Sequence, residues 1–150
     1  MTTYFDELVP GQCFETATRV LTEADIVSFA TTWDPQSFHL DHLGAEKGMF
    51  GKLAASGLQT LLISFRLCID AGAFTPAAVA GLGLKNVTFH RPVFPNDRLQ
   101  STVSVVKMRA SRSRSNLGIV WWHLDTRTQK GDVVLSMDFT NLLTRRPSTH

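Results

Sequence analysis

The spacing of apolar residues changes along the chain, from a helical period in the first half to partial alternation in the second. Apolar residues recur at helical spacing after Thr22, and Thr22 and Asp25 have the spacing of a capping box. The pattern therefore predicts a helix from about Glu23 to Thr31. The Asp34-Pro35 step ends it, because the residue before a proline is disfavoured in the helical region.

The strongest helical signal runs from Ser56 to about Ala73. A stripe of apolar residues recurs within it at helical spacing: Leu58, Leu61, Leu62, Phe65 and Ile69. Further apolar residues flank this stripe, so we expect most of the circumference of the helix to be buried. A helix of about 18 residues would span about 27 Å.

Beyond this helix, four stretches are rich in β-branched and aromatic residues and alternate partly between apolar and polar. They cover residues 84–89, 98–108, 118–126 and 133–143. The separators carry turn-forming residues such as Asn96 and Gly131, and short separators imply antiparallel neighbours. With a further strand expected at Gln12–Val20, the sequence predicts an α+β fold. A curved antiparallel sheet of about five strands would wrap around the long apolar helix.

The segment between the two helices, residues 33–54, is rich in Gly, His and short polar residues. Only a brief helix is indicated there, near His42 to Lys47. An irregular segment of this length in a compact domain is usually functional or disordered. We expect Asp34 and His39, within this segment, to lie in a polar loop and to support no part of the core.

Length and composition favour one soluble domain over residues 1–150, with a loose tail from about 144 to 150. Apolar residues make up 43% of the chain, and no unbroken apolar run is long enough to span a bilayer. The first residues lack the features of a secretion signal, which favours a cytoplasmic location. A net charge of only +2 gives no general reason to expect nucleic acid or a membrane as partner.

The two cysteines, Cys13 and Cys68, are far apart and show no CxxC or Cys/His clustering. We therefore expect neither a structural disulfide nor a metal site, since a free cysteine most often behaves as a small buried apolar residue.

The first candidate for chemistry is the pair Asp34 and His39, five residues apart on a turn that Pro35 stiffens. Histidine titrates near neutral pH, and a neighbouring carboxylate can orient it, so the pair can move a proton between water and a substrate. The alternative is a turn whose polar side chains simply face solvent.

The second candidate is Ser56-Gly57 at the start of the long helix. Ser56 is a good N-cap, and Gly57 would leave the N–H groups of the first turn open to a ligand that develops negative charge. Helix capping alone also explains the serine. A third feature, Arg109, Arg112 and Arg114 in the run MRASRSRS, is either a solvated loop or a contact for a phosphorylated ligand.

Several segments together resemble the MaoC-like dehydratase family, which has the hot-dog fold and includes (R)-specific enoyl-CoA hydratases. The resemblance runs through FDELVPGQ, VLTEADIVSFA, WDPQSFHLD, FGKLAASGLQT, NVTFHRPVFPNDRL, SRSRSNLGIV and QKGDVVL. WDPQSFHLD, followed about 17 residues later by ASG, is its most specific part. Many hydratases of the family have Asn-Pro where this chain has Gln36 and Ser37.

The resemblance implies catalytic roles for Asp34 and His39, and thioester binding at Ser56 and Gly57. Gln36 and Phe38 become candidate pocket residues, while Arg112 and Arg114 become candidate contacts for the phosphates of coenzyme A.

The implied reaction is the reversible hydration of a trans-2-enoyl-CoA to a (3R)-hydroxyacyl-CoA, as in fatty acid metabolism. No metal or redox cofactor is implied, because coenzyme A is part of the substrate, and a homodimer or higher homo-oligomer is expected. Two alternatives stay open: a hot-dog acyl-CoA thioesterase, and a catalytically silent acyl-CoA-binding subunit.

Overall fold

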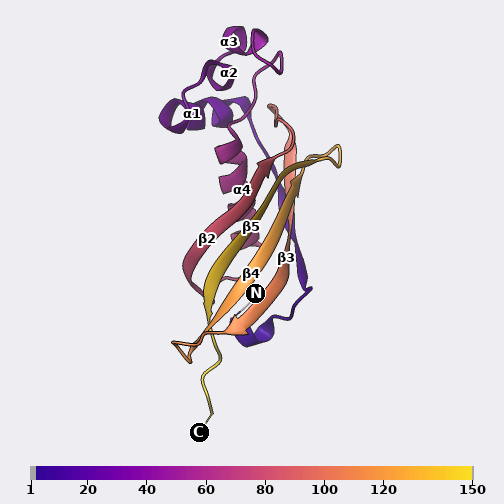
Figure 1. The fold of residues 1–150 in the computed structure, drawn as a ribbon. Coiled ribbons are helices and arrows are strands. Elements are labelled where there is room, and N and C mark those ends of the chain that lie inside the picture. Colours follow the sequence, from indigo (N-terminus) through magenta and orange to yellow (C-terminus); the bar gives the residue numbers. More distant parts are fainter. Residues whose placement is uncertain (1–2, 150) are drawn as a thin grey trace.

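The computed structural model describes residues 3–149, which form one antiparallel sheet with helices at one end and along one face (Figure 1). The five strands in chain order are β1 (Cys13–Val20), β2 (Ala78–Phe89), β3 (Arg98–Ala110), β4 (Leu117–Arg127) and β5 (Val133–Thr144). In space they follow the order β1-β3-β4-β5-β2, and each neighbouring pair is antiparallel. The predicted α+β fold with a sheet of about five strands is confirmed.

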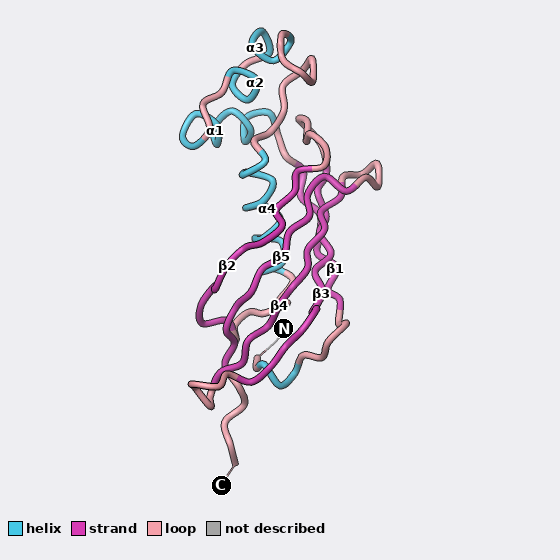
Figure 2. Tube along the Cα trace, in the orientation of Figure 1, coloured by secondary structure: helices cyan, strands magenta, loops and turns pink. Residues whose placement is uncertain are grey.

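The helices differ greatly in length. They are the short 3-10 turn η1 (Phe5–Glu7), then α1 (Glu23–Trp33), α2 (Ser37–Leu40), α3 (His42–Glu46) and α4 (Gly57–Asp70). Helices α1, α2 and α3 gather at one end of the sheet, where α4 begins, and α4 then runs along the sheet (Figures 1 and 2). This end of the molecule therefore brings the irregular segment, the start of α4 and the ends of several strands together.

Helix α1 begins as the sequence predicts. Thr22 Oγ1 accepts a hydrogen bond from the Asp25 N–H at 3.1 Å, and Asp25 Oδ2 accepts one from the Thr22 N–H at 3.3 Å. This reciprocal capping box satisfies two N–H groups that the helix itself cannot pair. At its other end the helix continues to Trp33, with Asp34 as the C-cap residue.

Helix α4 is shorter than predicted, because it ends at Asp70 and is followed by Gly72 with a φ of +73°. The predicted buried stripe is wrong in part, since Leu58 and Leu62 are 51% and 55% exposed, whereas its other members, Leu61, Phe65 and Ile69, are partly buried against the core. The buried face of the helix consists instead of Gln59, Thr60, Ile63, Ser64, Leu67 and Cys68.

Internal hydrogen bonds explain why a partly polar face is the buried one. Ser64 Oγ donates to the Thr60 carbonyl at 2.7 Å and accepts from Thr126 Oγ1 of β4, also at 2.7 Å. Thr126 Oγ1 is in turn 2.6 Å from Ser101 Oγ of β3. A buried hydroxyl costs little when it is hydrogen-bonded, so α4 seats these small residues against the sheet and leaves larger leucines outside.

Strand β2 begins at Ala78, earlier than predicted, and all of its residues are exposed. Its first half shows no alternation because neither face of this edge strand is buried against the rest of the chain. Exposed apolar side chains nevertheless follow β2, including Val79, Leu82, Leu84 and Phe89.

The core lies between the sheet and α4. An aromatic cluster of Phe65, Phe74, Trp122 and Phe139 forms one part of it, with ring centroids 5.5 to 5.9 Å apart. Trp122 is buried and its indole N–H donates to Asn141 Oδ1 at 2.8 Å. Strand β5 continues through Thr144, and the Arg146 N–H then donates to Asp6 Oδ2 at 2.7 Å.

Candidate active site

The structure brings Asp34 and His39 together where α1 ends and α2 begins. His39 Nε2 lies 3.4 Å from Asp34 Oδ2. The expectation that residues of this segment lie in a polar loop and support no core is wrong for His39. It belongs to α2 and is only 5% exposed, and its ring packs against Phe38 with the centroids 4.1 Å apart.

One hydrogen bond fixes the orientation of the His39 ring. Its Nδ1 lies 2.6 Å from the carbonyl oxygen of Ala54. A carbonyl oxygen only accepts, so Nδ1 carries a proton, and in the neutral form of the ring the lone pair of Nε2 is presented toward Asp34. His39 is therefore poised to accept a proton at Nε2.

Two side-chain donors hold the Asp34 carboxylate. Ser56 Oγ donates to Oδ2 at 2.7 Å, and Gln36 Nε2 donates to Oδ1 at 2.5 Å. These two hydrogen bonds, that from Ser56 being the stronger influence, hold the pKa of Asp34 below its ordinary value. Asp34 is thus a carboxylate at neutral pH.

The geometry of the pair suits the binding of one water molecule. In the neutral form of His39, Nε2 and the ionised Asp34 Oδ2 are both acceptors, and neither can donate to the other across the 3.4 Å between them. A water molecule has two hydrogens and can satisfy both acceptors at once. Water held in this way has its oxygen lone pairs free to attack a substrate.

Ser56 is the N-cap of α4, as predicted, and its Oγ accepts a hydrogen bond from the Leu58 N–H at 3.3 Å. The N–H groups of Gln59 and Thr60 both donate to the Ser56 carbonyl. Within residues 3–149 the N–H of Gly57 has no acceptor, so this backbone donor is left for a ligand.

Gly57 also makes a close packing contact. A Cβ atom at this position would lie 2.8 Å from the ring of Phe89, the last residue of β2. The absence of a side chain therefore lets the end of β2 approach the start of α4.

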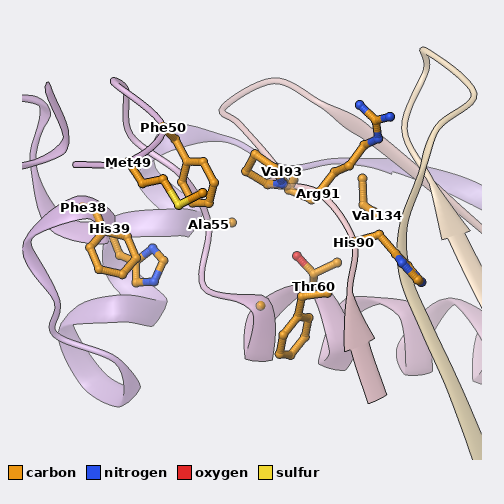
Figure 3. Close-up of a pocket in the computed structure, with 13 residues that line it drawn as sticks. Phe38, His39, Met49, Phe50, Ala55, Thr60, His90, Arg91, Val93 and Val134 are labelled. Carbon is orange, nitrogen blue, oxygen red and sulfur yellow. The ribbon is translucent and has the colours of Figure 1, made fainter. Parts of the chain in front are cut away.

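A cavity of about 370 Å³ lies beside His39, and Figure 3 shows Phe38 and His39 at one end of it, with His90, Arg91 and Val134 toward the other. The lining residues are Phe38, His39, Met49, Phe50, Ala55, Gly57, Thr60, Phe89, His90, Arg91, Pro92, Val93 and Val134. Phe38, a candidate pocket residue, lines it. Gln36, the other candidate, does not line the cavity, and its amide donates a hydrogen bond to Asp34 instead.

Arg112 and Arg114 lie on the turn between β3 and β4, at the end of the sheet opposite to α1–α3 (Figure 1). Both are exposed, and within one chain the structure does not bring them near Asp34 and His39. Their contact with the phosphates of coenzyme A stays a prediction.

The remaining histidines and the cysteines lie apart from this site or at its edge. His42 is exposed and 2.6 Å from Glu23 Oε1, and Cys13 and Cys68 are both free thiols. Burial raises the pKa of Cys68 to about 12. Residues 3–149 contain no group of three or more His, Cys, Asp or Glu arranged to bind a metal ion. In the same range, no helix combines the length and hydropathy needed to cross a membrane.

A sequence model of the MaoC like domain matches residues 7–121. The chain belongs to the MaoC-like dehydratase family. An uncharacterised protein of Bacillus subtilis, YdeM, is 38% identical over 140 residues, which are 93% of this chain and 98% of that protein. These matches confirm the family to which the sequence motifs pointed.

Solved structures agree with this assignment. A MaoC-like dehydratase from Rhodospirillum rubrum superposes with a TM-score of 0.88 at 35% identity, covering 97% of this chain and 99% of the other. The R-hydratase PhaJ1 of Pseudomonas aeruginosa superposes with a TM-score of 0.73 at 25% identity, covering 96% and 87%. A Mycobacterium tuberculosis protein described as a double hot-dog fold has a TM-score of 0.82 at 22% identity over 98% of this chain and 46% of that one. The hot-dog fold is thereby confirmed, and the family and its neighbours support a hydratase or dehydratase activity in general.

Proposed function

We propose that this protein catalyses the reversible addition of water to a trans-2-enoyl-CoA, giving a (3R)-hydroxyacyl-CoA. The observation that carries the proposal is the pair His39 Nε2 and Asp34 Oδ2, which lie 3.4 Å apart, with His39 lining one end of the cavity. The family and the similarity to an R-hydratase support the same reaction class.

In this mechanism the pair binds the water that attacks the third carbon of the acyl chain. His39 Nε2 accepts a proton from the water as its oxygen bonds to that carbon. The electron pair of the carbon–carbon double bond moves toward the second carbon, which receives the proton back from His39. Asp34 orients the water and stabilises the imidazolium that forms transiently. All atoms of water therefore enter the product, and the hydrogen and hydroxyl add to the same face.

Negative charge develops on the thioester oxygen during this addition. We assign its stabilisation to the Gly57 N–H, which has no acceptor among the described residues and lies at the positive end of α4. Ser56 holds the first turn of α4 and the Asp34 carboxylate together, so the donor and the dyad keep a fixed relation.

The proposed reaction uses no metal or redox cofactor, because proton transfer and charge stabilisation account for every step. Coenzyme A belongs to the substrate, and we place the reaction in the cytoplasm, with no nucleic acid or membrane as partner.

We further propose a homodimer formed through β2. Among residues 3–149 only one edge of β2 is paired, to β5, and its apolar side chains are exposed. An apolar hollow of about 480 Å³ between β2 and the Phe65–Ile69 side of α4 adjoins this edge. An exposed apolar edge strand is a surface that proteins normally cover. In sedimentation, the double substitution Leu82→Lys with Leu84→Lys should give a monomer. The control Val106→Lys, at an exposed position of β3, should leave the dimer intact. A wild-type monomer would refute the dimer.

The reaction itself is tested with a panel of enoyl-CoA thioesters of different acyl lengths, followed by the loss of absorbance of the conjugated thioester. Hydration of at least one member supports the proposal. Release of free thiol without hydration would identify a thioesterase, and tight binding of all members without turnover would identify a silent binding subunit.

A further inference from the structure

We propose that Arg91 and Lys130 bind a phosphate group of the coenzyme A part of the substrate, an inference that rests on the proposed function. The two residues line a second, smaller hollow of about 140 Å³ beside the active-site cavity. Arg91, Pro92 and Val134 line both hollows, so the two spaces adjoin each other at Arg91. A ligand that extends from the cavity into the smaller hollow would meet both cationic side chains.

Backbone hydrogen bonds fix the position of Arg91 relative to the dyad and α4. The His90 N–H donates to the Val134 carbonyl at 2.9 Å, and the Ala55 N–H donates to the Val93 carbonyl at 2.8 Å. The segment that carries Arg91 is therefore tied to β5 on one side and to the residue before Ser56 on the other.

The guanidinium of Arg91 has N–H donors available for a ligand. Its side chain is 63% exposed, and its only ion pair within residues 3–149 is with Asp132, at the long distance of 4.0 Å. In the same range the ammonium of Lys130 forms neither an ion pair nor a hydrogen bond. The forked donors of arginine match the oxygens of phosphate, with lysine adding a second positive charge.

The carboxylates near this hollow compete only weakly for these cations. Asp97 is buried and accepts hydrogen bonds from the Phe94 N–H at 2.9 Å and from Gln129 Nε2 at 2.8 Å. It therefore serves the turn before β3. Asp132 alone faces Arg91, so it is the residue that an incoming phosphate must displace.

The direction of the Arg91 side chain identifies the part of the substrate that it contacts. Figure 3 shows it extending away from His39, and the side chain is largely exposed. Near His39 and Phe38 the lining is largely apolar, which suits the acyl group. The phosphates of coenzyme A are joined to the thioester by the flexible pantetheine arm, so they lie at the outer end. A carboxylate at the end of an acyl chain offers similar oxygens, and the experiment separates these two sources.

The test measures binding of free coenzyme A and of pantetheine, which lacks phosphate, to the full chain by calorimetry. Arg91→Gln and Lys130→Gln should each weaken coenzyme A binding by about 3-fold to 10-fold, a moderate loss because both contacts are exposed. Asp132→Asn should strengthen it by about 2-fold, since it removes the competing carboxylate. Pantetheine binding should not change, and Arg112→Gln with Arg114→Gln, which removes the rival pair, should weaken coenzyme A binding less than Arg91→Gln does.

Unchanged affinity of Arg91→Gln for coenzyme A overturns the proposal, as does a larger loss in the Arg112, Arg114 double variant. An Arg91→Gln defect that appears equally with pantetheine thioesters of dicarboxylic acids assigns Arg91 to an acyl carboxylate and also overturns it. Because no turnover is measured, failure of the hydration assay does not affect this result, and the two proposals are tested separately.

Discussion

The hydroxyl of Ser56 donates a 2.7 Å hydrogen bond to Asp34 Oδ2, joining the N-terminus of α4 to the segment that follows α1. The same oxygen accepts the Leu58 N–H, so Ser56 caps the helix and holds the carboxylate with one side chain. This arrangement keeps Asp34 beside His39 and lowers its pKa.

Ser56→Ala should therefore change both stability and the pKa of Asp34. Loss of the cap should lower the free energy of unfolding by about 1 kcal/mol. Removing a donor raises the pKa of Asp34 toward its ordinary value, and NMR titration of the Asp34 carboxyl measures this shift. A pH–rate profile would not isolate it, because protonation of the base His39 also lowers kcat/KM as pH falls. Gln36→Met, which removes the other donor but keeps the cap, should raise the pKa of Asp34 in the same way, and identical titrations for all three proteins would contradict the assignment.

His39→Asn separates the chemical role of the ring from its structural role. Asparagine retains an N–H close to the position of Nδ1, which can still donate to the Ala54 carbonyl, but it has no group at Nε2. We expect kcat to fall by about 100-fold to 10,000-fold, as for other lost acid–base groups.

The matched variant His39→Ala should lose similar activity and also about 1–3 kcal/mol of stability, because it leaves the buried carbonyl unpaired. Urea denaturation and turnover together distinguish the two variants. Substantial activity in either would show that His39 transfers no proton.

Gly57→Val tests the backbone donor at the start of α4. The new side chain meets the Phe89 ring, which is half exposed and free to yield. The change in stability should then be small, whereas loss of access to the Gly57 N–H should lower kcat by about 100-fold to 1,000-fold. Combining it with Phe89→Ala removes the contact. The double variant should remain much less active than Phe89→Ala alone, and equal activities would refute the role of the donor.

Protonation of His123, which lies on the outer face of the sheet, should make the free energy of unfolding depend on pH. Its Nδ1 lies 2.7 Å from Asp138 Oδ1 and its Nε2 lies 3.2 Å from Asp125 Oδ1. Burial alone would lower the pKa of His123, but the hydrogen bond to Asp138 and the charges of both aspartates raise it above its ordinary value.

A raised pKa in the folded state means that the protonated form stabilises the fold. This contribution is complete below the unfolded pKa of about 6.5 and is lost as pH rises through the folded pKa. Denaturation from pH 6 to pH 9 should show the stability difference between wild type and His123→Gln shrinking as pH rises. A constant difference would exclude this linkage.

Sequence patterns predicted the elements whose signals are local. The capping box at Thr22 and Asp25 marked the start of α1, and alternation located β3, β4 and β5 to within a few residues. The short helix α2 has too few residues to show a period, and the first half of exposed β2 has no buried face to create one.

Hydrophobic periodicity did not predict which face of α4 is buried. Counting apolar residues favours burial of Leu58 and Leu62, yet the helix buries Ser64 because hydroxyls on β3 and β4 satisfy it. Those partners come from distant parts of the sequence, so only the folded chain shows that burying a serine is inexpensive here.

The candidate site, too, was predictable from the sequence only in part. The short spacing of Asp34 and His39 made their proximity predictable, and family resemblance pointed to Ser56 and Gly57. Neither source contained the bond from Ser56 to Asp34 or the burial of His39, because both depend on how α4 packs beside α2. The hollow lined by Arg91 and Lys130 likewise forms only where the segment after β2 meets the β4–β5 turn.

The central claim is that His39 and Asp34 hold the added water on one face of the substrate, and that its proton returns to the second carbon on that face. Hydration of a trans-2-enoyl-CoA in deuterated water, followed by NMR of the product, measures this directly. The account predicts the 3R alcohol with deuterium and hydroxyl added to the same face. A 3S product, or addition to opposite faces, would contradict it.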